Sequence, residues 1–420
     1  MKTLILCLFS AISLYASIKS GSLCAVEYSS SLSRNATVNS VDAVFTNPAG
    51  VTLLQDGFYV YLVNNSMFST KEAKNSVFNK TYVLKSKNIF LPVGAALYKK
   101  DKLGVFLSFS YPGISAGGQA DNGILVMDAV AAVTSGALSQ ALNSKVSVSA
   151  QNKSFEFGGG ALGVTVGAAY QLIPMISISA AIMPVYGYDF LKGGYDLVLP
   201  SGVVVSRQKI DTRSEAKYAG GIFGLNLKLH EKINLGFRYQ TKVKLEYTQE
   251  TKVDSFVPNK ISYADGKKTR GDLPALAGAG AGIQILPNLM TQLSVTYFFQ
   301  KDANYKGKDP NYTLYQNSYI AAAGAEYQFC KLMGISAGYA YRNNGVNENT
   351  LNSTAINNSY HSVAGGLSLV VSPRISFKAG YIQSICIDAK GKEVLEGTSL
   401  GDDDLTFVTR AISIGTQIKF

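Results

Sequence analysis

The sequence predicts an all-β protein, a 14-stranded antiparallel transmembrane β-barrel. Three observations predict this fold class. Charges are few while glycines and aromatic residues are many, apolar and polar side chains alternate over long stretches, and the connections between those stretches are alternately short and long.

The composition excludes several other classes of protein. Of the 420 residues, 16% are charged and 47% hydrophobic, with 40 glycines, 25 tyrosines and 20 phenylalanines. A soluble protein carries about a quarter charged residues. Beyond the N-terminus no apolar run reaches the roughly 18 residues of a spanning helix, and the aromatic content excludes a disordered chain. A soluble β-sandwich and a membrane β-barrel remain.

The N-terminus has the features of a secretory signal peptide over residues 1–25, which favours the barrel. Lys2 supplies a positive charge, residues 4–14 form an apolar core, and small residues are frequent from 16 to 22, so we expect cleavage between Ala16 and Ala25. Cys24 would suit an acylated lipoprotein, but Leu23 stands where a small residue is wanted.

The remaining cysteines indicate neither a disulfide framework nor a zinc site. Cys330 is expected at a short turn and Cys386 at the opposite rim, too far apart for a bridge. No metal and no cofactor is therefore expected.

The clearest alternation runs over sixteen residues, 233–248, where odd positions are apolar or aromatic and even positions mostly polar. Strands of soluble proteins are usually about 5–6 residues long, whereas alternation of this length is typical of transmembrane β-strands. The stretches 289–300 and 335–342 repeat the pattern.

Fourteen strands are predicted, at 58–68, 88–99, 102–112, 155–171, 175–188, 214–229, 233–248, 271–286, 289–300, 316–329, 332–342, 359–371, 375–385 and 405–420. Short turns and long connections alternate along the whole series. Outer-membrane barrels show this pattern, with tight periplasmic turns and extended outer loops.

Residues 57–420 thus form the predicted barrel, and residues 26–56, which lack clean alternation, precede it. The chain ends on a face formed by alternate residues from Ile412 to Phe420. Within it, Gly415, Ile418 and Phe420 resemble the signal by which the barrel-assembly machinery recognises its substrates.

The longest outer connection, about 113–154, contains a stretch of helical composition at 124–143 that is apolar nearly all round. A water-exposed helix would carry a polar stripe. Two interpretations remain open: the helix packs against the rim of the barrel, or Ile124, Met127 and Val130 offer a landing site for a hydrophobic ligand.

The net charge of +11 comes from scattered lysines and arginines, without the interleaved aromatics of a nucleic-acid site. Contact with anionic lipid headgroups, attraction of an anionic solute and solvated loops all account for it. Catalysis is not expected, because neither Ser359 nor Ser362 beside His361 lies in a nucleophile motif, and neighbouring strand residues point to opposite faces.

The segment 39–51, which reads NSVDAVFTNPAGV, resembles part of the hatch of the FadL/TodX family of outer-membrane transporters for long-chain fatty acids and other hydrophobic compounds. In that family the hatch is an N-terminal segment that plugs the lumen, so the resemblance implies an N-terminal hatch over residues 26–56. The hatch-motif residues are Asp42, Asn47, Pro48 and Ala49. A second match is GDLPA at 271–275. Because Pro48 fixes its own φ and restrains Asn47, this loop is suited to a rigid plug.

The resemblance implies uptake of hydrophobic small molecules, with long-chain fatty acids as the expected ligands, across the outer membrane of a diderm bacterium. Ligand would pass from an outer groove to a pocket, and after a hatch rearrangement leave through the wall at a kinked third strand; Pro112-Gly113 is the candidate kink. The alternatives are an adhesin or ligand-binding barrel with a closed lumen, and a porin for polar solutes. A monomer is expected, with outer-membrane lipid around it.

Three cations in 233–248 are candidates for holding an acidic headgroup. Arg238, Lys242 and Lys244 share the even positions with Glu246. Facing lipid near the midplane would cost about 2–4 kcal/mol for each cation. The alternation therefore predicts a ladder of lumen cations, either free for a carboxylate or already paired.

Overall fold

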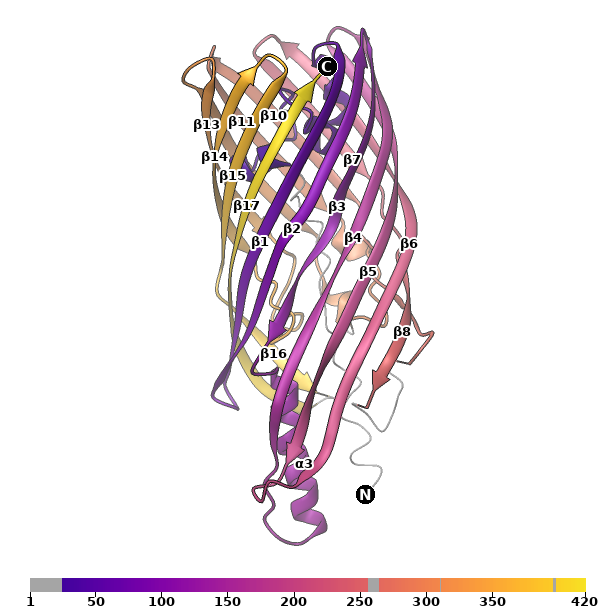
Figure 1. Ribbon diagram of the computed structural model, residues 1–420, viewed down its shortest axis with the longest axis vertical. Coiled ribbons are helices and arrows are strands. Elements are labelled where there is room, and N and C mark those ends of the chain that lie inside the picture. Colours follow the sequence, from indigo (N-terminus) through magenta and orange to yellow (C-terminus); the bar gives the residue numbers. More distant parts are fainter. Residues whose placement is uncertain (1–24, 256–263, 310, 396–397) are drawn as a thin grey trace.

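The fold is a closed antiparallel β-barrel around an internal N-terminal segment (Figure 1). The computed structural model describes residues 25–255, 264–309, 311–395 and 398–420. The barrel closes because β1 pairs with both β2 and β17. Apart from Ala25, the predicted signal peptide lies outside the described residues, as does Cys24.

The described strands are β1 (Gly57–Asn75), β2 (Lys80–Lys100), β3 (Leu103–Ala120), β4 (Ser149–Ile173), β5 (Ile176–Val198), β6 (Val204–His230), β7 (Ile233–Gln240), β8 (Glu246–Asp254), β9 (Lys268–Arg270), β10 (Leu276–Leu286), β11 (Leu289–Phe298), β12 (Ser318–Gln328), β13 (Met333–Asn343), β14 (Tyr360–Ser372), β15 (Ile375–Cys386), β16 (Ala389–Leu395) and β17 (Thr398–Lys419). β7 and β8 occupy one position in the wall, β9 and β10 another, and β16 forms a hairpin with the start of β17. The predicted 14-stranded barrel is confirmed.

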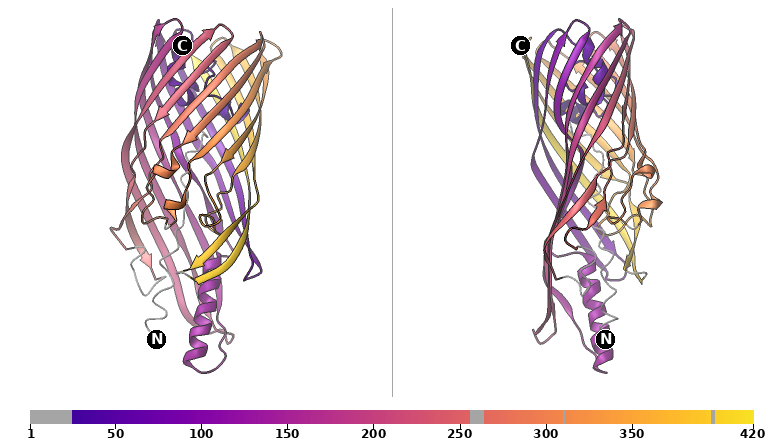
Figure 2. Two further views of the ribbon diagram at one scale, coloured as in Figure 1. Left: turned by 180° about the vertical axis from the view of Figure 1, so that it is seen from behind. Right: turned by 90° about the vertical axis from the view of Figure 1, so that its right-hand side faces the viewer.

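The short turns gather at the end of the barrel that carries the C-terminus, at the top of Figure 1; we call this the turn end. The long connections lie at the opposite, loop end, where β4, β5 and β6 project with a helix (Figures 1 and 2). β1 to β6 extend further toward the loop end than predicted. In β1 the apolar alternation stops after Phe68 while the backbone pairing continues to Asn75.

The alternation identifies the two faces of the wall correctly in most strands. In β17, Ile412 and Ile414 are exposed on the outside and Ser413 is buried inside, and β11 repeats this with Leu293, Ser294 and Val295. Exposed apolar side chains form a belt around the barrel, as expected for contact with lipid.

The prediction of one continuous strand over 233–248 is wrong. The wall strand breaks after Gln240 and resumes at Glu246. Between the pairs Ile222–Gln240 and Glu215–Thr248, β6 advances seven residues and its partner eight. The extra residue acts as a bulge, and such a slip turns the following side chains to the other face. Lys244 is therefore exposed on the outside, while Leu245 is buried.

The predicted outer helix exists as α3 (Leu125–Ala141), which lies among the projecting strands at the loop end. Ile124, Met127 and Val130 are buried in an apolar cluster with Phe155 of β4 and Leu191 of β5. The structure thus has these side chains packed rather than displayed on the surface. Of the helices the structure describes, none is long and apolar enough to cross a membrane.

Residues 26–56, the hatch, lie inside the lumen toward the turn end. They contain α1 (Val26–Ser31), α2 (Ala43–Thr46) and a 3-10 helix, η1 (Pro48–Leu53). α1 packs against β12 to β15 and β17, and η1 packs against β4, β5 and β6. Nearly every residue from 25 to 52 is buried.

Glycines on the lumen face make room for the hatch. A Cβ atom on Gly366 of β14 would collide with the hydroxyl oxygen of Ser30 in α1. A Cβ on the neighbouring Gly365 would meet nothing closer than a backbone oxygen at 3.8 Å. The difference arises because adjacent residues of a strand face opposite sides of the wall.

We expect Gly366→Val to displace the hatch while the barrel remains folded, because the closed ladder of the wall does not depend on α1. Overpacking of this kind costs about 1–3 kcal/mol. Limited proteolysis should cut the N-terminal segment faster in this variant, with unchanged heat-modifiable gel migration. Gly365→Val is the matched control, and equal proteolysis of the two variants would contradict the placement of α1.

Candidate functional site

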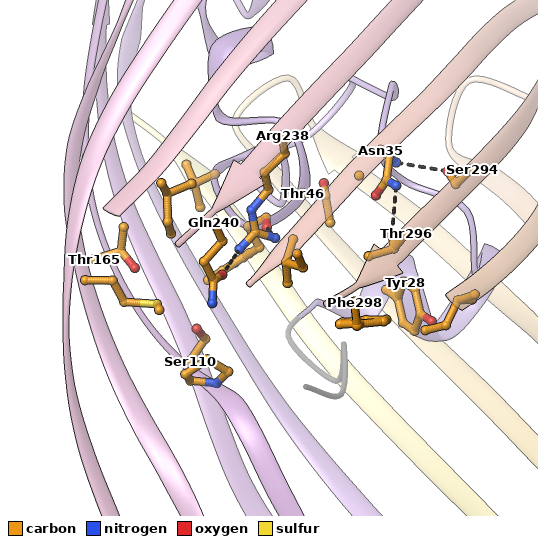
Figure 3. A pocket seen from close by; sticks show the side chains of 18 of the residues that line it. Tyr28, Asn35, Thr46, Ser110, Thr165, Arg238, Gln240, Ser294, Thr296 and Phe298 are labelled. Carbon is orange, nitrogen blue, oxygen red and sulfur yellow. Dashed lines mark hydrogen bonds between the residues drawn. The ribbon is translucent and has the colours of Figure 1, made fainter. Parts of the chain in front are cut away.

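A pocket with an empty volume of about 920 Å³ lies in the lumen on the loop side of the hatch (Figure 3). Its floor comes from α1, α2 and the residues between them, and its sides come from strands of the wall. The lining residues are Tyr28, Leu32, Asn35, Val44, Phe45, Thr46, Ser108, Ser110, Tyr111, Pro112, Thr165, Met183, Ile222, Arg238, Gln240, Leu276, Gly278, Ser294, Thr296, Phe298, Ile320 and Ala322. Apolar side chains are mixed with hydroxyl and amide groups on these walls, which suits a ligand that has both apolar and polar parts.

Arg238 is the one charged side chain among the described residues that line this pocket. Its Nη1 donates a hydrogen bond to the carbonyl oxygen of Phe45 in the hatch (2.5 Å), and its Nη2 donates to Gln240 Oε1 (2.6 Å; Figure 3). Both acceptors are neutral. The guanidinium therefore touches the pocket and the hatch at once.

The structure does not bring the three predicted cations together. Only Arg238 lines the pocket. Lys242 Nζ donates to the carbonyl oxygen of Asp302 (2.9 Å) in the loop after β11, and Lys244 is exposed outside. The predicted ladder is wrong because the bulge after Gln240 reverses the faces.

The pocket reaches a seam in the wall between β2 and β3. The pairing of these strands passes from Gly94–Phe109 directly to Lys85–Gln119, so residues 86–93 and 110–118, all of them described, form no ladder with each other. β3 stays paired with β4 through two bulges, at 110–113 and 115–118. Ser110, Tyr111 and Pro112 line the pocket, and Phe90 is exposed on the β2 side.

The predicted kink at Pro112-Gly113 coincides with the first of these bulges. It lies in the middle of β3, not at its outer end, because β3 continues to Ala120.

The loop between β11 and β12 covers part of the lumen at the loop end. Lys308 of this loop forms an ion pair with Asp189 of β5 and lies over the Tyr247 ring, 3.1 Å from its centroid. Burial lowers the pKa of Lys308, and the carboxylate of Asp189 opposes that shift. The loop is thereby tied across the mouth of the barrel.

On the turn side of the pocket, a buried arginine joins the hatch to the wall. Arg34 donates from Nε and Nη2 to the two carboxylate oxygens of Asp42, each at 2.8 Å. Its Nη1 donates to Glu326 of β12, and Nη2 also donates to Asn39 Oδ1 at 2.7 Å. We call this group the Arg34 lock.

A second cavity, with an empty volume of about 660 Å³, lies on the turn side of the hatch. Glu326, Glu27 and Lys378 are among its lining residues. The Nζ atom of Lys378 lies 3.3 Å from Oε1 of Glu27. Tyr61 and Ser40 donate hydrogen bonds to Glu27. Among the described lining residues, the hatch thus separates a pocket with one charged side chain from a chamber with three.

The hatch-motif residues take defined places. Asp42 is part of the Arg34 lock. Asn47 donates from Nδ2 to Asn226 Oδ1 of β6 at 2.6 Å, Pro48 opens η1, and Ala49 is fully buried.

The residues of the C-terminal signal lie at the turn end of β17. A Cβ on Gly415 would come within 2.9 Å of Val26 in α1, Ile418 pairs with Val60, and Phe420 is exposed. Their recognition by the assembly machinery stays a prediction.

Sequence reasoning missed Arg34, Glu326 and Lys378. Glu326 and Lys378 fall on the polar face of their predicted strands, which was a signal that they point into the lumen. Arg34 lies in a segment without alternation, and only the fold shows that it meets Glu326, 292 residues later.

We expect Arg34→Met to loosen the hatch, because Asp42 and Glu326 would then be buried without their cation. Breaking a buried ion pair from one side costs about 3–5 kcal/mol. Faster hydrogen–deuterium exchange of residues 26–53 and higher leak conductance in planar bilayers should follow, and adding Glu326→Gln should restore part of the protection. Arg374→Met, at an exposed turn, is the control; unchanged exchange in Arg34→Met would contradict the lock.

Among known proteins, likeness appears in structure and not in sequence. No family model and no curated protein matches the chain. A Pseudomonas aeruginosa FadL homologue superposes with a TM-score of 0.69 at 14% identity, covering 96% of this chain and 100% of that one. The P. putida toluene transporter TodX gives 0.64 at 13% identity, covering 94% and 98%. The Ralstonia pickettii toluene transporter TbuX gives 0.57 at 14%, covering 90% and 93%.

These matches extend over nearly the whole length of both chains. At such low identity they show the fold, and they confirm that the chain has the FadL- and TodX-like barrel that its sequence predicted.

Proposed function

We propose that the protein takes up hydrophobic small molecules that carry an acidic headgroup, long-chain fatty acids among them, across the outer membrane of a diderm bacterium. One observation carries the proposal: a pocket lined by both apolar and hydroxyl-bearing side chains holds a single arginine among its described lining residues and extends to a wall seam. The similar structures named as a FadL homologue and toluene transporters support hydrophobic ligands.

Arg238 selects the headgroup in this proposal. A guanidinium offers parallel N–H donors that match a carboxylate. Two of its present acceptors are the carbonyl of Phe45 and the amide oxygen of Gln240. An arriving carboxylate would take over these donors, because charge-assisted hydrogen bonds are the stronger ones. Losing the hydrogen bond to Phe45 removes one of the contacts that hold the hatch.

The ligand leaves through the seam between β2 and β3. That route keeps its apolar chain in contact with pocket and lipid, whereas the turn side beyond the hatch is polar and charged. Binding thus weakens the hatch at Phe45, and the apolar chain slides past Tyr111 and Pro112 to the bilayer.

The ligand-binding barrel with a closed lumen remains the second candidate. The strands and helix that project at the loop end favour it, with Leu142 and Val203 exposed there. In that case ligand would bind outside and no transfer through the seam would occur.

We expect Arg238→Gln to weaken binding of a long-chain fatty acid about 10- to 100-fold, since a hydrogen bond to a charged group contributes about 1.5–3 kcal/mol. Binding of the alcohol of equal length should change little. Lys244→Gln is the control, because this cation lies outside on the same stretch of wall. Fluorescence displacement on the detergent-solubilised protein measures both ligands, and equal loss of acid and alcohol would remove Arg238 as the headgroup site.

A second test addresses the seam. With Cys330→Ser as background, Phe90→Cys and Ile114→Cys joined by a bifunctional thiosulfonate should stop ligand transfer into liposomes, and reductant should restore it. The control pair is Tyr98→Cys and Val105→Cys, which face each other in the intact ladder of the same strands. Transfer that continues with the seam cross-linked would contradict lateral exit.

A further inference from the structure

The loop between β13 and β14, residues 344–359, folds into the loop end of the lumen. Its Leu351 and Ile356 are buried against the inward side chains Ala73 of β1 and Leu405 of β17. We call it the roof loop.

The roof loop is tied to itself and to the wall by asparagine side chains. Asn344 donates from Nδ2 to the carbonyl oxygens of Asn357 (3.1 Å) and Asn358 (2.7 Å). Asn358 donates from Nδ2 to the carbonyl oxygens of Leu405 (2.7 Å) and Ile387 (3.1 Å). The loop therefore closes as one unit against the hairpin of β16 and β17.

Two carboxyl groups meet behind the roof loop. Glu393 of β16 lies where the pairing with β17 shifts between Lys392–Asp402 and Val394–Ser399, so the extra residue is in β17, opposite Glu393. Lys392 and Val394 on either side of Glu393 are exposed, so the alternation of β16 turns Glu393 inward, toward Asp403. Glu393 is 7% exposed and Asp403 is fully buried. Because Gly391 pairs with Asp403, Glu393 is the diagonal neighbour of Asp403 on the inward face of the hairpin.

Each of the two carboxyl groups also accepts a hydrogen bond from a neighbouring element. The Ser353 backbone N–H of the roof loop donates to Glu393 Oε2 at 3.0 Å. Asn75 Nδ2 of β1 donates to Asp403 Oδ1 at 2.8 Å. Asp403 Oδ2 is buried and receives no hydrogen bond from another described N–H or hydroxyl group.

Two ionised carboxylates in such contact would repel each other without water to screen them, so a proton or a cation must lie between them. Calcium takes about six to eight oxygen ligands. The described residues contain no group of three or more acidic, histidine or cysteine side chains arranged for a metal. The proton is therefore the better occupant.

We propose that Glu393 and Asp403 share one proton and form an acid-closed latch that holds the roof loop over the loop end of the lumen. The shared proton lets Glu393 keep its bond to Ser353 while Asp403 keeps its bond to Asn75. When the proton leaves, repulsion separates β16 from β17 and the roof loop loses its tie.

Most of the surrounding charges point away from the pair. Lys390, Lys392, Asp402 and Asp404 are exposed on the outer face of the hairpin, and Lys392 pairs with Glu348 of the roof loop at 2.5 Å. Burial and, to a lesser extent, the charge of Asp402 raise the pKa of Asp403. On β1, Glu72 and Lys74 are exposed, as is Asp388 before β16, while Lys71 is partly buried on the same face of β1 as Asn75. From β2 the Tyr82 hydroxyl faces the pair but donates to Asp128 of α3 (2.9 Å), which is neutralised by Lys80 and Lys153.

The direction of the pH effect follows from burial. Burial, together with the charge of Asp403, raises the pKa of Glu393 from 4.5 to about 7. In the open state the carboxyl meets water and its pKa returns toward 4.5. The closed state thus binds the extra proton, and its advantage, complete below about 4.5, is lost as the pH rises to about 7. The opening constant rises by at most about tenfold per pH unit over this window.

The start of the roof loop connects the latch to the residues that line the pocket. Arg342 of β13 donates to Asn344 Oδ1 at 2.7 Å and lies over the ring of Phe298, which lines the pocket. The idea that opening of the roof loop admits ligand rests on the proposed uptake function. The idea that the loop opens as the pH rises does not depend on that function.

Hydrogen–deuterium exchange of residues 344–359 in the intact barrel tests the latch, with wild type compared with Glu393→Gln at each pH. The ratio of the two rates cancels the intrinsic pH dependence of exchange. Because the amide introduced by this substitution cannot ionise, we expect the wild type to resemble the variant near pH 5 and to exchange at least about tenfold faster near pH 7.5. Asp403→Asn should act like Glu393→Gln, and Glu348→Gln, at the exposed ion pair, should behave as wild type.

A constant ratio across this range would overturn the latch. So would protection restored at about pH 7.5 by calcium and removed by a chelator, which would place a cation between the carboxyl groups. If the exchange result holds but fatty-acid transfer is equal at the two ends of the pH range, the latch stands and its role in uptake fails.

Discussion

The closed ladder of backbone hydrogen bonds is the constraint on which the rest of the structure depends. A barrel wall without an edge satisfies its own polar groups in lipid, so its stability does not require anything inside. The lumen is then free to hold a segment of the same chain. The cost falls on the inward side chains, which must leave room for that segment. Glycines such as Gly366 and Gly236 stand where hatch atoms come closest to the wall.

The proposed function depends on two places where this ladder of hydrogen bonds is interrupted. Between β2 and β3 the pairing stops over the stretch that adjoins the pocket, and after Gln240 a bulge sends Lys244 outside. Buried ionic and amide contacts around Arg34 and Asn47 hold the hatch, together with an apolar cluster in which Val44 and Phe45 pack with wall residues such as Tyr61. Desolvation offsets much of the gain from buried ion pairs, so the polar contacts fix the position of the hatch more than they add stability.

Much of the fold could be predicted because successive side chains of a strand point to opposite faces of the wall. In 289–300 and 405–420 one alternation holds across the membrane-spanning part, so the lumen and lipid faces could be assigned before the structure. The stretch 233–248 shows the same alternation in its sequence, but it contains one more residue than the paired part of β6. Alternation cannot detect such a bulge, which depends on the register with β6. The Arg34 lock was out of reach because it joins the hatch to β12, which only the folded barrel brings together. The Glu393–Asp403 pair lies in the hairpin of β16 and β17, where the alternation predicted no strand before residue 405. Ile124, Met127 and Val130 were recognised as helical and apolar, but their packing partners lie on strands that extend further than the apolar pattern.

The central claim is that the pocket beside Arg238 holds an apolar molecule with an acidic headgroup. Mass spectrometry of the small molecules released on denaturing the purified, extensively washed protein tests this most directly. The account predicts an apolar carboxylic acid at about one molecule per barrel. Recovery of membrane phospholipid alone, or of no amphiphile from protein purified in the presence of fatty acid, would contradict it.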